Sequence, residues 1–487
     1  MIEENIKIHD KFKFEIKFNY PIKDKKTKYQ IESYLFFPKT LGMAESFNND
    51  NFYESIQSYI RFKTPTILLK DIISKNGVIT ILKNNFETLV RDFNKKKKKN
   101  FENSIKLYGV IVKSSFREHS ELIQKKTNNK DIDFLVNEYI THAKKVLEEY
   151  RKLRYIITVP TIREKTFAIY KYGNEYLSLI FNKYTYNILE DIKNNEIINK
   201  KFRIKLLDLI KEETQYRIDN NLKIKINKDG DNSLFLYRAS NLKKYISSLL
   251  FLNTRTNKAD TVITQIVYSL AAALSMVFAT LVAFNAQQYF GNFTTPLFVA
   301  LVISYVFKDR IKDLVKLYFH NNFRKRVFDY KTVIKDDDNK IGLANERATL
   351  LESKHLNDEI KKARIPKRFS LIQNGMRGED IILYEKKIKI YNTALNENLN
   401  GIKVDGINDI IRFDVSNYLK NMDNPTKKIY YYENNDYSII KAKRIYHINL
   451  VMLYKDSKKN KVLKRFRIVL NRKGIVDIIN LDKLGKI

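Results

Sequence analysis

The hydrophobic pattern is strongest in the middle of the chain, where no Asp, Glu, Lys, Arg or His occurs from Thr261 through Phe307. A helix that crosses a bilayer needs about 20 mainly apolar residues. Residues 261–284 meet this requirement comfortably. The second half is shorter, because only the stretch from Phe293 to Phe307 is strongly apolar. The pattern therefore predicts a transmembrane helical hairpin over residues 259–307, with helices at about 261–284 and 291–307.

The segment between the two predicted helices, Asn285–Asn292, is short and uncharged. Gly291 interrupts the first helix, and Pro296 suits the first turn of the second. So short a link makes the helices antiparallel neighbours. A buried hairpin of a soluble protein is the alternative, and so long an uncharged stretch in a lysine-rich chain argues against it.

Basic residues on both flanks of this segment predict its orientation, because cytoplasmic flanks of membrane helices are rich in Lys and Arg. The link itself carries none. We therefore expect a multi-pass protein of the cell (inner or plasma) membrane, with both termini in the cytoplasm. The predicted membrane-surface residues are Arg255, Lys258, Lys308, Arg310, Lys312, Lys316, Arg324, Lys325 and Arg326.

Small residues recur every fourth position in both predicted helices, a spacing that lets helix backbones approach closely in lipid. They could pack the hairpin on itself or form the contact of a homodimer, and the sequence leaves both alternatives open. These residues are Ala271, Ser275, Ala279, Ala283, Ala300 and Ser304.

The region before the membrane segment, residues 1–254, has the pattern of an α+β structure. Phe12–Phe18 alternates apolar and polar residues, which predicts a strand, and Tyr29–Phe37 is its predicted partner. Ile132–Arg154 has helical spacing of apolar residues. Asp229-Gly230 predicts a β-hairpin turn, with strands at Leu222–Ile226 and Leu234–Tyr237.

After the membrane segment, residues 308–365 are predicted to form a juxtamembrane helix and a linker. Residues 366–487 are rich in strand patterns and predict a mainly antiparallel β domain. The predicted fold class is thus α+β, with the membrane hairpin between the two soluble regions. The expected C-terminal strands are Ile381–Tyr391, Tyr430–Tyr432, Arg444–Tyr454, Val462–Leu470 and Ile475–Ile479.

Composition changes this picture in two ways. The formal net charge is +35, which allows a nucleic-acid partner. The excess is mostly Lys, however, beside abundant Asn and Ile, which is typical of an AT-rich genome rather than of Arg-based recognition. Nucleic acid is therefore disfavoured as a partner but stays an alternative. Cysteine is absent, which excludes disulfides and thiolate sites.

Sequence motifs for catalysis are missing: there is no phosphate-binding glycine loop, no hydrolase elbow and no zinc-protease helix. His119, near Glu118 and Glu121, is interpreted as a residue on the exposed surface of a helix. Asp131 and Asp133 are interpreted as carboxylates that cap a helix. We accordingly predict no catalytic, cofactor-binding or metal-binding residue.

Two basic or aromatic segments have alternative interpretations. The run Lys95–Lys99 is predicted to be a solvated loop, with a contact to acidic lipid or nucleic acid as the alternative. Tyr430–Tyr432 could stack nucleobases, although one face of such a strand usually joins the core.

Together these patterns favour an interaction or scaffold protein at the membrane, with the lipid bilayer and an unknown protein as partners. A membrane-tethered enzyme with an unrecognised active site and a membrane-tethered nucleic-acid binder are the alternatives.

Overall fold

The computed structural model describes residues 3–22, 25–222, 226, 230–322, 327–336, 339–364, 378–391, 404, 406–456 and 460–482. The chain forms two compact units. The first combines Met1–Ile60, Leu252–Ala394 and Ile407–Ile487, and the second consists of Arg61–Phe251 with Leu395–Gly406. This division differs from the sequence-based one, which placed residues 1–254 and 366–487 in separate regions.

An antiparallel eight-stranded sheet dominates the first unit, in the order β14-β13-β12-β3-β8-β7-β6-β5. Its central strand β3 comes from the N-terminus and pairs with β8 and β12 from the C-terminal half, so the two predicted soluble regions share one sheet. The strands are β3 (Lys26–Pro38), β5 (Asn253–Lys258), β6 (Tyr330–Asp336), β7 (Asn339–Leu351), β8 (Glu379–Tyr391), β12 (Tyr446–Lys455), β13 (Lys461–Asn471) and β14 (Gly474–Asn480).

A second sheet covers one face of the large sheet. It has the order β1-β2-β9-β4, with β1 (Glu3–Ile8), β2 (Lys13–Pro21), β4 (Ile56–Phe62) and β9 (Gly406–Asp414). Aromatic contacts join the two layers, with ring centroids 5.8 Å apart for Phe18 and Tyr454 and 5.1 Å apart for Tyr20 and Tyr29. The predicted pairing of Tyr29–Phe37 with Phe12–Phe18 is wrong, because these segments lie in different sheets. Ile31–Phe37 is buried on both faces, as only an interior strand can be.

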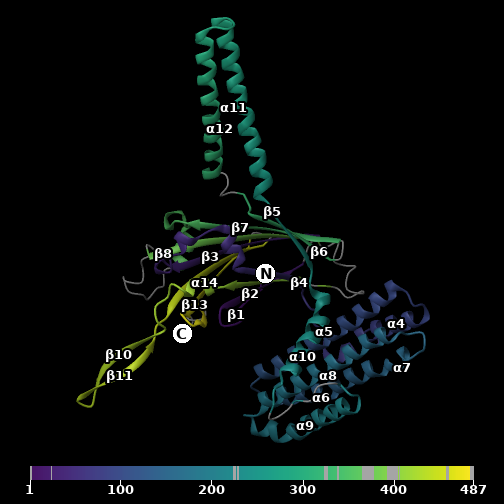
Figure 1. The fold of residues 1–487 in the computed structure, drawn as a ribbon. Coiled ribbons are helices and arrows are strands. Elements are labelled where there is room, and N and C mark those ends of the chain that lie inside the picture. The colour runs from purple at the N-terminus through teal and green to yellow at the C-terminus, as the bar shows by residue number, and fades with distance from the viewer. Residues whose placement is uncertain are drawn as a thin grey trace. The chain divides into compact units, whose positions relative to one another are not determined.

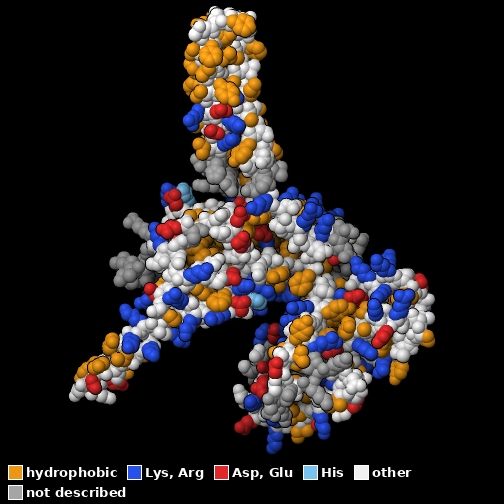
Figure 2. Space-filling view, in the orientation of Figure 1, with side chains coloured by type: hydrophobic (Ala, Val, Ile, Leu, Met, Phe, Trp, Pro, Cys, Tyr) orange, Lys and Arg blue, Asp and Glu red, His pale blue; other side chains and the backbone are white. Residues whose placement is uncertain are grey.

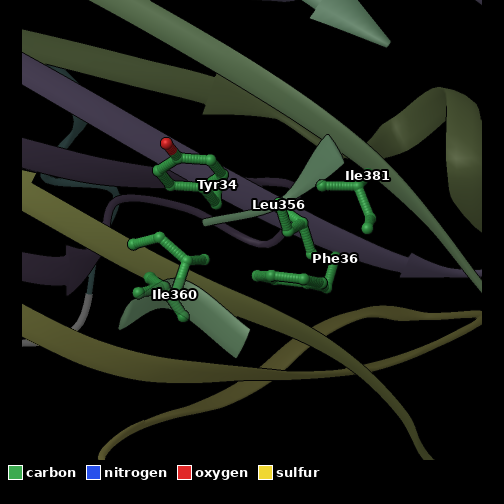
Figure 3. Packing of buried hydrophobic residues seen from close by; sticks show 6 residues of the cluster. Tyr34, Phe36, Leu356, Ile360 and Ile381 are labelled. Carbon is green, nitrogen blue, oxygen red and sulfur yellow. The ribbon is translucent and has the colours of Figure 1, made fainter. Parts of the chain in front are cut away.

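We call the face toward the second sheet the inner face and the opposite one the outer face. Strand residues alternate between them, so Tyr29 lies on the inner face while Tyr34 and Phe36 lie on the outer face. One end of the outer face is covered by Leu356 and Ile360, the latter in the short helix α13 (Asp358–Arg364), as Figure 3 shows.

Beyond the two sheets, β10 (Thr426–Glu433) and β11 (Asp436–Lys443) form a two-stranded ribbon that projects from the first unit (Figure 1). Every residue of β10 is exposed. Tyr430–Tyr432 therefore contributes to no core, contrary to the common behaviour of such a strand. The predicted strands at 381–391, 444–454, 462–470 and 475–479 are confirmed as β8, β12, β13 and β14.

The second unit is helical. Its long helices are α4 (Val78–Arg91), α5 (Lys95–Lys125), α6 (Asn129–Lys152), α8 (Glu164–Ile192), α9 (Glu196–Asp219) and α10 (Ser233–Ser247). They pack around large buried rings such as Tyr108, Phe116 and Tyr150. Shorter helices in the chain are α1 (Met43–Ser46), α2 (Asn49–Glu54), α3 (Leu69–Ile72), α7 (Arg154–Ile157) and α14 (Ser416–Leu419).

Two predictions for this helical unit are wrong. Leu234–Tyr237 is not a strand but the start of α10, where the Asp231 carboxylate accepts a hydrogen bond from the Ser233 amide at 2.8 Å; most of its predicted partner lies outside the described residues. Lys95–Lys99 is not a loop but the first turn of α5. The Asn94 side chain caps that helix by accepting from the Lys97 amide at 2.9 Å.

The uncharged segment forms two antiparallel helices, α11 (Asp260–Phe290) and α12 (Thr295–Asn322), which project as a hairpin (Figure 1). The helix predicted after residue 308 is thus a continuation of α12. The predicted linker is wrong over residues 330–336 and 339–351, which form β6 and β7. Asp336 ends β6 and Asn339 begins β7, and these two residues are paired across the two strands.

Candidate membrane-binding site

The small residues of the hairpin lie between its two helices. Ala271, Ser275 and Ser304 are at most 4% exposed, and the Ser304 hydroxyl donates to the Ala279 carbonyl oxygen at 3.3 Å. Ala283 and Ala300 are half-buried. Close approach of the backbones thus accounts for these residues within one chain.

Large apolar side chains of the hairpin point outward instead. Leu270, Met276 and Phe284 of α11 are each more than half exposed, and Figure 2 shows apolar side chains over the far end of the hairpin. Within the described part of the chain, α11 is the one helix long and apolar enough to cross a membrane, over Thr264–Phe290, and the most apolar 18 residues of this range have a mean hydropathy of 2.1. The apolar part of α12 is shorter, because charges begin at Lys308.

The register of the two helices determines how much of the hairpin is uncharged on both helices. Ser304 lies beside Ala279, and the Lys316 ammonium lies 5.3 Å from the centre of the Tyr268 ring. The charged turns of α12 therefore lie next to the first half of α11. The charge-free part of α12 before Lys308 rises about 20 Å, against about 30 Å for the hydrocarbon core of a bilayer. A band of charged side chains partway along the hairpin is visible in Figure 2.

The predicted basic residues of α12 belong to this band of charged side chains, which begins at Lys308. The Lys308 ammonium lies 3.9 Å from the centre of the Tyr305 ring, and Lys316 lies 3.6 Å from the Asp313 carboxylate. Arg310 is exposed and Lys312 half-buried. Arg324, Lys325 and Arg326 lie outside the described residues.

The two predicted basic residues before α11 lie on opposite faces of the sheet, because side chains alternate between the faces along β5. Lys258 lies on the inner side of the sheet, where its ammonium pairs with the Asp50 carboxylate at 2.9 Å. Arg255 is exposed on the outer face, opposite Val333 of β6. Only Arg255 is therefore placed to join a basic outer surface.

That outer surface contains lysines that the sequence reasoning missed. In the pairing register, Lys387 lies opposite Gln30 and Asn345, Asn345 lies opposite Lys331, and Lys389 lies opposite Lys28. Cross-strand partners share a face, so these lysines form one group. We call Lys28, Lys331, Lys387 and Lys389 the lysine face. The basic residues that flank the hairpin in sequence do not reveal this group, because strand pairing brings together positions distant in sequence.

The lysine face lies at the foot of the hairpin. Phe328, in the segment from α12 to β6, has its ring centre 5.2 Å from the Lys387 ammonium. Ala259, just before α11, lines the same cleft as these lysines. The foot of the hairpin and the lysine face are therefore adjacent, and a cluster of lysines beside a membrane segment attracts anionic headgroups.

On the inner face, by contrast, a lysine is paired with carboxylates of the protein itself. Lys386 is fully buried, with its ammonium 2.7 Å from the Asp409 carboxylate and 3.1 Å from that of Glu346. Burial acts to lower the pKa of Lys386, but these two carboxylates outweigh it and raise the pKa above its ordinary value. Ser58 and Tyr384 donate hydrogen bonds to Asp409 and Glu346 at 3.2 and 3.0 Å. The cation is thus neutralised inside the protein.

The other candidate residues of the sequence do not form an acid–base site. His119 is buried rather than exposed, so its predicted position is wrong. Its Nε2 lies 2.7 Å from the Leu135 carbonyl oxygen, and burial lowers its pKa. Asp131 pairs with Lys126 and Asp133 with Lys201, while Asn128 supplies the helix cap.

Comparison with known proteins finds no matching family model, no similar curated protein and no similar solved structure.

Proposed function

We propose that this protein is anchored in the cell membrane by the α11/α12 hairpin and serves there as an interaction or scaffold protein. The hairpin crosses the bilayer twice, and the sheets of the first unit and the whole helical unit lie on the cytoplasmic side. The soluble units then bind a protein partner whose identity is unknown.

One observation carries the anchor: the 27 residues Thr264–Phe290 are uncharged and mainly apolar, yet only 11% of their most apolar 18 residues are buried. In water so large an apolar surface would favour aggregation, whereas lipid tails would cover it. The short apolar part of α12 is compatible with this position, because Lys308 and Arg310 can extend to the interface or the bilayer can thin locally.

The absence of cysteine makes the topology directly testable. Gln287→Cys places a thiol in the last turn of α11, and Lys473→Cys places one in the exposed turn between β13 and β14. In intact cells an impermeant maleimide should label position 287 and leave position 473 unlabelled until the membrane is opened. The reverse pattern would contradict the orientation, and extraction of the wild-type chain by alkaline carbonate would contradict the anchor.

The scaffold part of the proposal has its own test. Crosslinking in cells, followed by solubilisation in a mild detergent, should recover one protein partner in near-stoichiometric amount with the tagged chain. Recovery of the chain without any such protein would contradict the scaffold and favour the enzyme.

A second candidate function, a membrane-tethered enzyme, is favoured by a cleft of about 580 Å³ in the first unit. Its lining includes the carboxylates of Asp50 and Glu346 and the hydroxyls of Tyr53 and Ser58. Ser58 and Glu346 also contact Lys386 behind the cleft wall. Loss of a measured activity in Asp50→Asn, with an unchanged melting temperature, would support this alternative.

A further inference from the structure

A cleft of about 970 Å³ opens on the outer face of the large sheet, at the foot of the hairpin. Its walls come from strands that are distant in sequence and from both ends of the hairpin, through Ala259 on one side and Phe328 on the other. A cavity of this volume is in the usual range for a site that binds a small molecule.

Charge in this cleft is strongly one-sided. The lining contains six lysines and one carboxylate, that of Asp456. The lysines are Lys28, Lys331, Lys387, Lys389, Lys455 and Lys461. Such an excess of cations favours an anionic ligand, because bringing an anion among them relieves their mutual repulsion.

Not all six lysines are equally available. Lys455 pairs with Glu32, and Lys461 lies 3.8 Å from Glu359. Among the described residues, Lys331, Lys387 and Lys389 have no carboxylate within ion-pairing distance, and the contacts of the latter two are with aromatic rings. These three cations are the ones that an external anion can neutralise.

The apolar part of the lining points to the kind of anion. Val327, Phe328 and Leu343 lie in the same cleft as the lysines. A free phosphate gains nothing from such a wall, whereas the glycerol and first methylenes of a phospholipid do. The chain enters and leaves α11/α12 beside this cleft, so the cleft lies on the membrane-facing side of the first unit, provided that the hairpin lies in a bilayer.

We propose that this cleft binds the phosphoryl headgroup of an anionic phospholipid, with Lys331, Lys387 and Lys389 as its principal ligands. The position assigned to the lipid follows from the membrane anchor proposed above. The lysine chemistry does not, so the two proposals can fail separately.

The test uses the full chain in a non-ionic detergent, where binding does not depend on whether the hairpin crosses a bilayer. Short-chain dihexanoyl phosphatidylglycerol should bind at least roughly tenfold more tightly than dihexanoyl phosphatidylcholine, which has the same tails but no net charge. Binding is read by titration calorimetry. Equal affinity for the two lipids would overturn the proposal.

A triple variant, Lys331→Ser, Lys387→Ser and Lys389→Ser, should weaken phosphatidylglycerol binding roughly tenfold to hundredfold. The matched control changes Lys427, Lys428 and Lys441 of the exposed ribbon to Ser. It removes the same charge elsewhere and should bind within about twofold of the wild type. An equal loss in both variants would show a net-charge effect and overturn the assignment of the cleft.

A second variant is expected to strengthen lipid binding, so its result does not depend on a loss of binding. Asp456→Asn removes the one lining carboxylate and keeps a side-chain oxygen that can accept from the Asn460 amide, a bond of 2.9 Å. We expect phosphatidylglycerol to bind about two- to threefold more tightly. Unchanged or weaker binding would count against the cleft.

Two competitors distinguish the source of the phosphate. Inorganic phosphate should displace the lipid only at concentrations far above the lipid Kd, and an oligothymidylate should not displace it in equimolar amounts. Displacement by inorganic phosphate at lipid-like concentrations would overturn the lipid in favour of a free anion. Tight binding of the oligonucleotide at the lysine face would overturn it in favour of nucleic acid.

Discussion

Strand β8 carries Lys386 on the inner face of the large sheet and Lys387 and Lys389 on the outer face, and the two faces differ in what neutralises these cations. Lys386 has two carboxylates within 3.1 Å, whereas the other two have none within ion-pairing distance among the described residues. A buried cation requires internal partners because its desolvation is costly. An exposed one requires none, and is free to bind an anion from outside.

The largest effect should come from removing the inner cation. Lys386→Met leaves Asp409 and Glu346 buried without their cation, which should destabilise the sheet by about 3–5 kcal/mol. Hydrogen exchange of the β8 and β9 amides measures this loss. The control Lys387→Met should cost less than about 0.5 kcal/mol. If both variants cost the same, the distinction between the faces is wrong.

A lysine of the helical unit gives an intermediate case. Burial lowers the pKa of Lys113 to about 8, and the nearby cations Lys243, Arg61, Lys183 and Arg117 add to the shift. Below pH 8 the lysine is charged in both the folded and unfolded states, so the folded state bears the cost of its burial. Between pH 8 and about 10.4 the unfolded state binds more protons, and stability therefore rises with pH.

Lys113→Met should remove that dependence. We expect the free energy of unfolding of the helical unit to rise by about 2 kcal/mol at pH 7, allowing for the partial exposure of the side chain. The exposed Lys145→Met on α6 is the control and should show no gain. Urea unfolding at pH 7.0 and 9.5 tests this, and a stability of Lys113→Met that still rises with pH would contradict the assignment.

The smallest effect separates the two basic residues of β5. Arg255→Ser should weaken phosphatidylglycerol binding about fivefold, since one cation near the lipid surface contributes about 1 kcal/mol. Lys258→Ser should leave lipid binding unchanged, because Lys258 pairs with Asp50 on the other face. Loss of that exposed pair should lower stability by less than about 1 kcal/mol. If the two changes weakened lipid binding equally, the face on which a basic residue lies would not determine its contribution to lipid binding.

The sequence predicted local elements better than their partners. The alternation of apolar residues in Phe12–Phe18 and Ile381–Tyr391 identified real strands, because side-chain period is a local property. The partner of Tyr29–Phe37 was predicted wrongly, since pairing depends on residues as distant as Tyr384 and Val451. The two-helix hairpin was visible for the same local reason, as an uncharged stretch.

The candidate site shows the same limit. Basic residues flanking the hairpin were readable from the sequence, but neighbourhood in sequence does not reveal which face a residue occupies, as Arg255 and Lys258 show. The lysine face joins Lys28, Lys331 and Lys387 through strand register alone. Its position could be inferred only after the order of strands was known.

The central position of β3 has a consequence for synthesis. This strand ends at Pro38, but its neighbours β8 and β12 end at Tyr391 and Lys455, so the ribosome must add about 400 residues before both are available. At about 5–20 residues per second, this takes roughly 20 to 80 s. The hairpin is translated within that interval. If it enters lipid as it emerges, the large sheet closes beside the bilayer, with β3 waiting unpaired until the last third of the chain arrives.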